Sequence, residues 1–263
     1  MEQYGYNYNT EKSIKYETNY IMDMIQHIYN ITNKYTISHV IRKTNKKIIC
    51  VIKNIQNETY IMKAKLKDFL YPSEIDICKC IKKLSHPNLN KIIALYETPT
   101  LFIVISEYIE GVKMAETDKK LNNQNILLDV VSGIKYLHEN NIIHGDITPN
   151  NIIITNNGCA VIIDYDNATF MTKPVMTLGT CGFTPPEYNI NIITNKADIW
   201  MIGMTFYLLS YYKLLSVSST NEYMPDFSLF KNTNYDNAIR SMISSDYKKR
   251  PELSDVQKIL LKT

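Results

Sequence analysis

Glycine is scarce in the first part of this 263-residue sequence, where none occurs between Gly5 and Gly111. That stretch therefore lacks a glycine-rich turn of the kind whose backbone amides approach a phosphate closely. Arginine is also rare, with three among 29 basic residues, and the basic residues are scattered along the chain. Together with a net charge of only +3, this distribution does not indicate a nucleic-acid-binding surface.

Paired cysteines and long apolar runs are missing as well. The five cysteines are odd in number and show no Cys-X-X-Cys spacing, which favours reduced, buried thiols and a cytoplasmic location. The polar N-terminus does not resemble a signal peptide. The most apolar stretch, 199–215, contains Lys213 and falls short of the roughly 20 apolar residues of a membrane span. We expect it to form a buried core helix, and we expect no membrane association.

Hydrophobic patterns predict strands in the first half of the chain. Residues 35–66 favour three strands with turns near 43–46 and 54–58, and two further strands are expected at 91–96 and 101–106. Between these groups, a helix is expected to begin at Ser73 as N-cap, with Asp76 completing a capping box. Its predicted buried stripe consists of Ile77, Cys80, Ile81 and Leu84.

Helices dominate the second half. A strong amphipathic helix is predicted over 123–141, and two short strands are expected to turn at Asn156-Asn157-Gly158. This order predicts an α+β fold of two lobes. We expect an extension over 1–34 with a short amphipathic helix, a first lobe over 35–106 and a second lobe over 107–263.

Three polar residues after the long helix have the spacing of a metal and phosphate site. Asp146 and Asn151 lie on a predicted loop, and Asp164 ends the next hairpin. Each is also a common turn former, but all three in this register favour function. Phosphoryl transfer needs metal ligands, a cation on the phosphates and a carboxylate that orients the attacking hydroxyl.

The sequence resembles the eukaryotic-type protein kinases over residues 35–263. "HGDITPNN" is similar to the catalytic loop of that family, which implies Asp146 as catalytic base and Asn151 as a magnesium ligand; "DYD" implies Asp164 as the main ligand. The resemblance also implies ATP and Mg²⁺ as cofactors and a protein as substrate. It implies nucleotide-binding roles for Lys63 of "YIMK", the small gatekeeper Ser106, the hinge residues Glu107 and Ile109, and the apolar residues Ile48 and Ile61.

Further motifs follow in the family's order. "GTCGFTPPEY" resembles the end of an activation segment, in which Thr180 would contact Asp146 as in serine/threonine kinases. The resemblance pairs Arg250 with Glu187, gives Asp198 of "DIW" the task of holding the catalytic-loop backbone, and makes His144 a core residue that braces the loop.

The sequence departs from the family at several positions. The turn that should be glycine-rich reads "IRKTNKK", so side chains of Arg42, Lys43, Lys46 or Lys47 could contact phosphate, although a solvated hairpin tip is the simpler interpretation. Ile77 stands where the helix glutamate that pairs with Lys63 is expected, and Glu74 lies one turn earlier.

Other departures lie in the catalytic loop and metal motif. Thr148 replaces the catalytic-loop lysine, Gly145 replaces the arginine, and Asp166 ends the metal motif in place of glycine. Each lost stabilising donor costs roughly 10²-fold to 10³-fold in rate. The four retained residues, Lys63, Asp146, Asn151 and Asp164, predict weak catalysis.

Two other functions are open at this point. The chain could be a pseudokinase, a regulatory binding module that still holds nucleotide. It could also be a small-molecule phosphotransferase, since "HGD" before "PNN" is similar to aminoglycoside and choline kinases, which lack the "PPE", "DIW" and Arg250 set. "HGDI" and "DY" further resemble the vaccinia-related kinases, which suits a viral or parasite source and, if viral, the host cytoplasm. The sequence predicts neither the oligomeric state nor the protein substrate.

Overall fold

The computed structural model describes residues 34–71, 73–117, 123–171, 179–190, 194–211, 216–217 and 223–262. The helix expected near the N-terminus lies outside these residues. The described chain divides into two compact units. The first contains the chain up to Lys82 and Lys91–Tyr108; the second contains Lys83–Asn90 and the chain from Ile109 onward.

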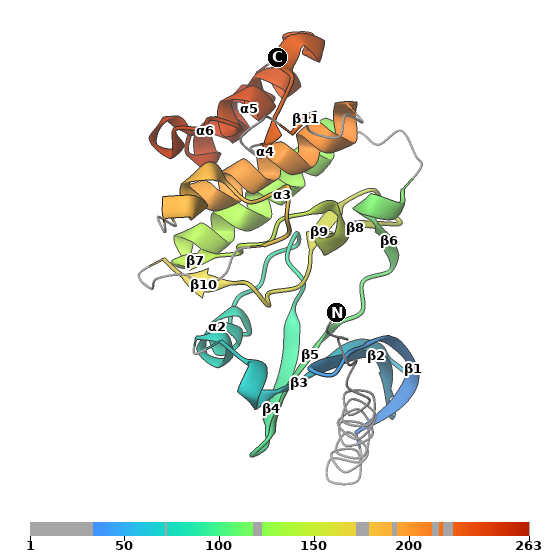
Figure 1. Ribbon diagram of the computed structural model, residues 1–263. Helices are drawn as coiled ribbons and strands as arrows, with labels where there is room; N and C mark the ends of the chain where they lie inside the picture. Colours follow the sequence, from blue (N-terminus) through green and yellow to red (C-terminus); the bar gives the residue numbers. More distant parts are fainter. Residues whose placement is uncertain are drawn as a thin grey trace, which may run out of the picture. The chain divides into compact units, whose positions relative to one another are not determined.

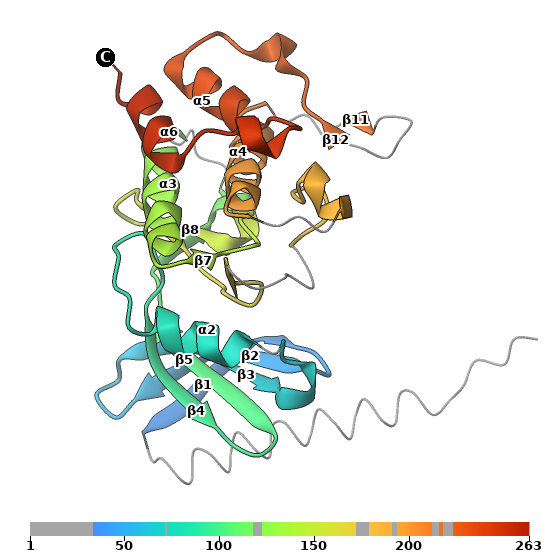
Figure 2. The same ribbon diagram turned by 90° about the vertical axis from the view of Figure 1, so that its left-hand side faces the viewer.

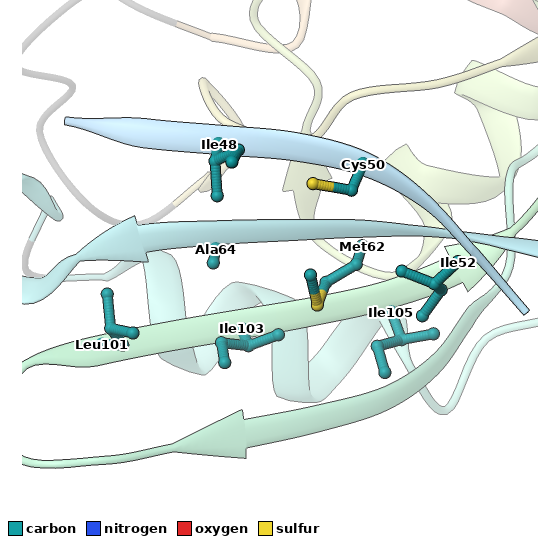
Figure 3. Close-up of a cluster of buried hydrophobic side chains, with 8 residues drawn as sticks. All are labelled: Ile48, Cys50, Ile52, Met62, Ala64, Leu101, Ile103 and Ile105. Carbon is teal, nitrogen blue, oxygen red and sulfur yellow. The ribbon is translucent and has the colours of Figure 1, made fainter. Parts of the chain in front are cut away.

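The first unit is built on a five-stranded antiparallel sheet (Figure 1). Its strands are β1 (Tyr35–Lys43), β2 (Lys47–Asn54), β3 (Thr59–Leu66), β4 (Ile92–Glu97) and β5 (Leu101–Glu107), in the order β1-β2-β3-β5-β4. The predicted strands and both predicted turns are confirmed. Alternate residues of β2, β3 and β5 form one apolar cluster on one side of the sheet, drawn in Figure 3: Ile48, Cys50, Ile52, Met62, Ala64, Leu101, Ile103 and Ile105.

Helix α2 (Glu74–Ile81) packs against this sheet (Figure 2). Ser73 precedes the helix, but its side chain makes no capping hydrogen bond, so the predicted capping box is wrong. The buried residues are Glu74, Ile77, Cys78 and Ile81, whereas Cys80 and Leu84 are only half-buried. The stripe is rotated from the predicted one because a charged residue, Glu74, occupies the buried side.

The second unit is mainly helical (Figure 1). Its helices α3 (Asn123–Glu139), α4 (Lys196–Tyr211), α5 (Asn234–Met242) and α6 (Leu253–Leu260) pack together. Strands β6 (Gly111–Lys113), β8 (Ile152–Thr155) and β9 (Ala160–Ile162) form a sheet in the order β6-β8-β9. Two pairs of two-residue strands complete the described part of the unit: β7 (Ile142–Ile143) with β10 (Thr169–Phe170), and β11 (Ser216–Val217) with β12 (Tyr223–Met224). The α+β prediction is confirmed.

Helix α4 is the core helix expected from the apolar stretch. Every residue from Ala197 to Tyr207 is buried, and the hydroxyl of Thr205 donates to the carbonyl of Ile147 at 2.9 Å, so its polar side chain is satisfied. No helix in the described ranges is long and apolar enough to cross a membrane. All five cysteines lie in described residues and are free thiols, but Cys159 and Cys181 are exposed, so the expectation of burial is wrong for these two.

The segment Lys83–Asn90 packs within the second unit. The Asn88 side chain donates to the carbonyl of Ala160 at 2.9 Å, and the backbones of Asn88 and Asn90 exchange hydrogen bonds with Ile162. The division of the chain therefore differs from the predicted lobe boundaries, because this connection after α2 belongs with β9 rather than with the first sheet.

Candidate active site

The carboxylate of Asp146 is held through both of its oxygens. Oδ1 accepts hydrogen bonds from the amide and the hydroxyl of Thr180, at 3.0 and 2.9 Å, and Oδ2 accepts one from Asn151 Nδ2 at 2.9 Å. The predicted contact between Thr180 and Asp146 is therefore confirmed. Gly179 (φ +49°) makes the approach possible, since a Cβ there would lie 2.9 Å from the carbonyl oxygen of Gly145.

Asn151 and Asp164 supply the atom types that magnesium prefers. Asn151 Nδ2 also donates to the carbonyl of Asp146 at 2.9 Å, so its amide nitrogen serves the loop and its side-chain oxygen is the atom suited to a metal. The amide of Ile163 donates to the carbonyl of Asn151 at 2.9 Å, which fixes the backbone immediately before Asp164 beside this residue.

Asp164 has a backbone conformation that is rare for a side chain of its kind. Its φ is +66°, in the left-handed region, and its Oδ1 accepts a hydrogen bond from the amide of Asp166 at 3.2 Å. Such conformations cost on the order of 1–3 kcal/mol and cluster at functional sites. Among the described residues, no three His, Cys, Asp or Glu side chains form a metal-binding group. One carboxylate and one amide fit Mg²⁺, which is commonly held by few protein ligands together with substrate phosphates.

Asp198 fixes the backbone of the catalytic loop, as predicted. Its buried carboxylate accepts hydrogen bonds from the amides of His144 and Gly145, at 2.9 and 2.8 Å, and contacts His138 Nε2 at 2.8 Å. Burial alone would raise the pKa of Asp198, but the hydrogen bonds and the nearby histidines lower it below its ordinary value. His144 is fully buried and accepts from the amide of Asp146 at 3.3 Å, which confirms it as a core residue bracing the loop.

The predicted pair of Arg250 with Glu187 is confirmed. Two guanidinium nitrogens contact the two carboxylate oxygens at 2.6 and 2.7 Å, and both residues are buried. The guanidinium also donates to the carbonyl of Ser244 at 2.9 Å and lies over the ring of Trp200. This bidentate arrangement anchors the segment after Thr180 to the helical unit.

In the first unit, strand register decides which predicted residues share a face with Lys63. Lys63 lies opposite Ile49 on β2 and Val104 on β5, and Ile61 lies opposite Val51 and Ser106. Directly opposed residues point to the same side of an antiparallel sheet. Lys63, Ile61 and Ser106 therefore share one face, as their predicted common role requires.

Ile48 does not belong to that face. It lies opposite Ala64 and is fully buried in the cluster on the other side of the sheet (Figure 3). Its predicted role in nucleotide binding is wrong, because neighbouring residues of a strand point to opposite faces. Ile49 and Val51 are the β2 residues on the Lys63 face, as the register of β2 with β3 shows.

The remaining predicted residues lie near the end of β5 and on the catalytic loop. Glu107 is exposed, and its amide donates to the carbonyl of Lys91 at 3.0 Å. Ile109 is half-buried just beyond the strand. Thr148 is 1% exposed. A short, neutral and buried side chain therefore stands where the resemblance places a lysine.

The β1–β2 turn, where a glycine-rich loop was missing from the sequence, is closed by Thr44. Its hydroxyl donates to the carbonyl of Lys47 at 3.1 Å and accepts from the amides of Lys46 and Lys47, at 3.2 and 3.1 Å. Its own amide donates to Lys47 O at 2.9 Å. Three amides of the turn are thus used internally, which favours a hairpin tip that does not offer them to phosphate.

The chain matches the family described as "Protein kinase domain" over residues 35–262. It belongs to the protein kinase family. The kinase domain is similar to the serine/threonine-protein kinase GRIK1 of Arabidopsis thaliana, with 31% identity over 62% of this chain and 48% of that protein. It is also similar to calcium-dependent protein kinase 6 of Plasmodium berghei, with 28% identity over 73% of this chain and 14% of that protein.

A bacterial relative extends the range of the similarity. The serine/threonine-protein kinase PrkC of Bacillus subtilis is 31% identical over 48% of this chain and 21% of its own length. The chain spans less than half the length of these three relatives.

Proposed function

We propose that this kinase domain transfers the γ-phosphoryl group of ATP to serine or threonine hydroxyls of protein substrates. The observation that carries the proposal is the Asp146 carboxylate, held at both oxygens by Thr180 and Asn151. A carboxylate fixed in this way can accept a hydrogen bond from a substrate hydroxyl and take its proton as the phosphoryl group is transferred. The names of the relatives, all serine/threonine-protein or calcium-dependent protein kinases, support the same substrate class.

The other residues have separate tasks in this proposal. Asn151 and Asp164 would hold Mg²⁺, which neutralises charge on the phosphates when bound. Lys63 would bind the nucleotide phosphates, with Ile61, Ser106, Glu107 and Ile109 contacting the base. The Thr44-closed turn and the buried Thr148 withhold donors that would stabilise the transferring group, so we expect slow turnover.

The test compares the wild type with Asp146→Asn in phosphorylation of itself and of casein with labelled ATP. We expect incorporation by the wild type and a loss of at least about 10²-fold in the variant, the usual contribution of a positioned base. Thermal stabilisation by ATP shows whether the wild type and Asp146→Asn both still bind the nucleotide. The same measurement with and without Mg²⁺, and on Asp164→Ala, shows whether binding depends on the metal. Equal incorporation by wild type and Asp146→Asn would exclude catalysis by this site.

A pseudokinase is the second candidate, favoured by the turn amides that Thr44 occupies. It predicts magnesium-independent or absent nucleotide binding and no incorporation by the wild type. A small-molecule phosphotransferase is disfavoured by the Arg250–Glu187 pair and the kinase-domain match. A position near the vaccinia-related kinases and a cytoplasmic location stay predictions that rest on the sequence motifs and the cysteine pattern.

A further inference from the structure

Glu74, the first residue of α2, forms a buried ion pair with Lys65 of β3. Lys65 Nζ lies 3.0 Å from Oε1 and 2.8 Å from Oε2, and the two side chains are 11% and 6% exposed. Lys65 follows Lys63 by two residues, so both lysines point to the same face of the strand. The pair therefore joins α2 to the strand segment that carries the proposed phosphate-binding lysine.

Tyr71 contacts both members of the Lys65–Glu74 pair. The amide of Tyr71 donates to Glu74 Oε2 at 3.3 Å, and the Lys65 ammonium lies 5.6 Å from the centre of the Tyr71 ring. The amide of Glu74 in turn donates to the carbonyl of Tyr71 at 3.0 Å. One turn further along α2, the fully buried Ile77 fixes the same side of the helix by apolar packing. Position and rotation of α2 are thus set by a charge contact and an apolar contact together.

The same unit contains a second Lys–Glu ion pair that is more exposed to solvent. Lys67 Nζ contacts Glu97 Oε1 at 2.6 Å, but these side chains are 26% and 44% exposed. Exposed pairs contribute about 0–1 kcal/mol, whereas removing one partner of a buried pair leaves an uncompensated charge and is strongly destabilising. The exposed pair is therefore a matched control from the same unit.

We propose that Lys65 and Glu74 are a positioning pair for Lys63. Lys65 lies two residues along β3 from Lys63, and Glu74 lies three residues before Ile77, the position where the resemblance places the helix glutamate. This inference rests on the proposed function, since it assumes that Lys63 binds the nucleotide phosphates.

The test measures ATP affinity by thermal shift and, separately, KM for ATP and kcat. We expect Lys65→Met and Glu74→Gln each to weaken ATP binding by about tenfold, equivalent to about 1.4 kcal/mol. The exchanged double variant, Lys65→Glu with Glu74→Lys, should regain most of the loss. Lys67→Met and Glu97→Gln should bind ATP as the wild type does.

A parallel measurement on Lys63→Met separates the two hypotheses. Unchanged ATP binding in Lys63→Met would contradict the role assigned to Lys63 under the proposed function. Loss of binding in Lys63→Met, with wild-type binding in folded Lys65→Met and Glu74→Gln, would overturn the positioning pair alone. If these variants do not fold, Glu74→Asp, which keeps the charge but shortens the side chain, replaces them. We expect it to weaken ATP binding about threefold, an effect of about 0.7 kcal/mol, and wild-type affinity would overturn the inference.

Discussion

At the scale of single residues, removing the hydroxyl of Thr180 tests whether the orientation of the Asp146 carboxylate affects kcat. In Thr180→Val the backbone amide bond to Asp146 can persist, but the 2.9 Å bond from the hydroxyl is lost. A hydrogen bond to a charged group contributes about 1.5–3 kcal/mol, so we expect kcat to fall by about tenfold or more while KM for ATP stays unchanged. Steady-state kinetics would measure this, with Thr180→Ser as the control that keeps the hydroxyl. A change in KM for ATP alone would contradict the assignment.

Asp198 makes a second prediction, about pH. Its pKa is lower in the folded protein than its ordinary value, so the unfolded chain binds more protons in acid. The stabilisation is therefore present above about pH 4, the ordinary pKa of an aspartate, and is lost as the pH falls. We expect Asp198→Asn to lower the free energy of unfolding at pH 7 by about 3 kcal/mol. Urea unfolding at pH 7 and at about pH 2 should show the difference from wild type shrinking in acid; a constant difference would argue against the charge.

At the scale of elements, the β1–β2 hairpin depends on one side chain. Thr44 makes hydrogen bonds to three backbone groups across the turn. We expect Thr44→Val to reduce the free energy of unfolding by about 1–2 kcal/mol, measured by urea denaturation. Thr36→Val is a matched control, since the Thr36 hydroxyl is exposed and makes a 3.4 Å contact with the carbonyl of Lys53. Equal effects of the two substitutions would show that the turn does not depend on Thr44.

The elements also show which features the sequence could predict. The pair of Arg250 with Glu187 was predicted from the family resemblance, because the two motifs that carry these residues follow in the family's order. Strands and turns were found from alternation alone. The resemblance placed Ile48 on the nucleotide-binding face, and only the register of β2 with β3 shows that Ile49 occupies that face.

Contacts between elements were harder to predict than the elements themselves. Ser73 and Asp76 form a good local capping pattern, but the helix begins instead with Glu74 turned inward to Lys65. Local preference was overridden by a tertiary ion pair, which depends on residues nine apart in sequence. The partner of Glu74 became visible only when the strand and the helix were placed together.

At the scale of the whole molecule, Gly145 predicts how activity depends on modification. The resemblance places an arginine at this position, where it would contact a phosphorylated activation segment; here Gly145 (φ +76°) is buried and its amide donates to Asp198. A phosphate on the segment would therefore lack that partner. We expect the kinase domain to phosphorylate casein at an unchanged rate after it has been treated with a broad-specificity phosphatase and the phosphatase has been removed. A large loss of rate after dephosphorylation would contradict this prediction.

The connection Lys83–Asn90 has a practical consequence for dissecting the protein. Because Asn88 and Asn90 are bonded to β9, a fragment ending at Tyr108 would carry this connection without Ala160 and Ile162, exposing the buried Leu89 and leaving amide groups unsatisfied. A helical fragment starting at Ile109 would in turn lack the strip of chain that pairs with its own β9. The two units therefore cannot be separated by one break in the chain, because the segment Lys83–Asn90 of the second unit precedes Lys91–Tyr108 of the first unit.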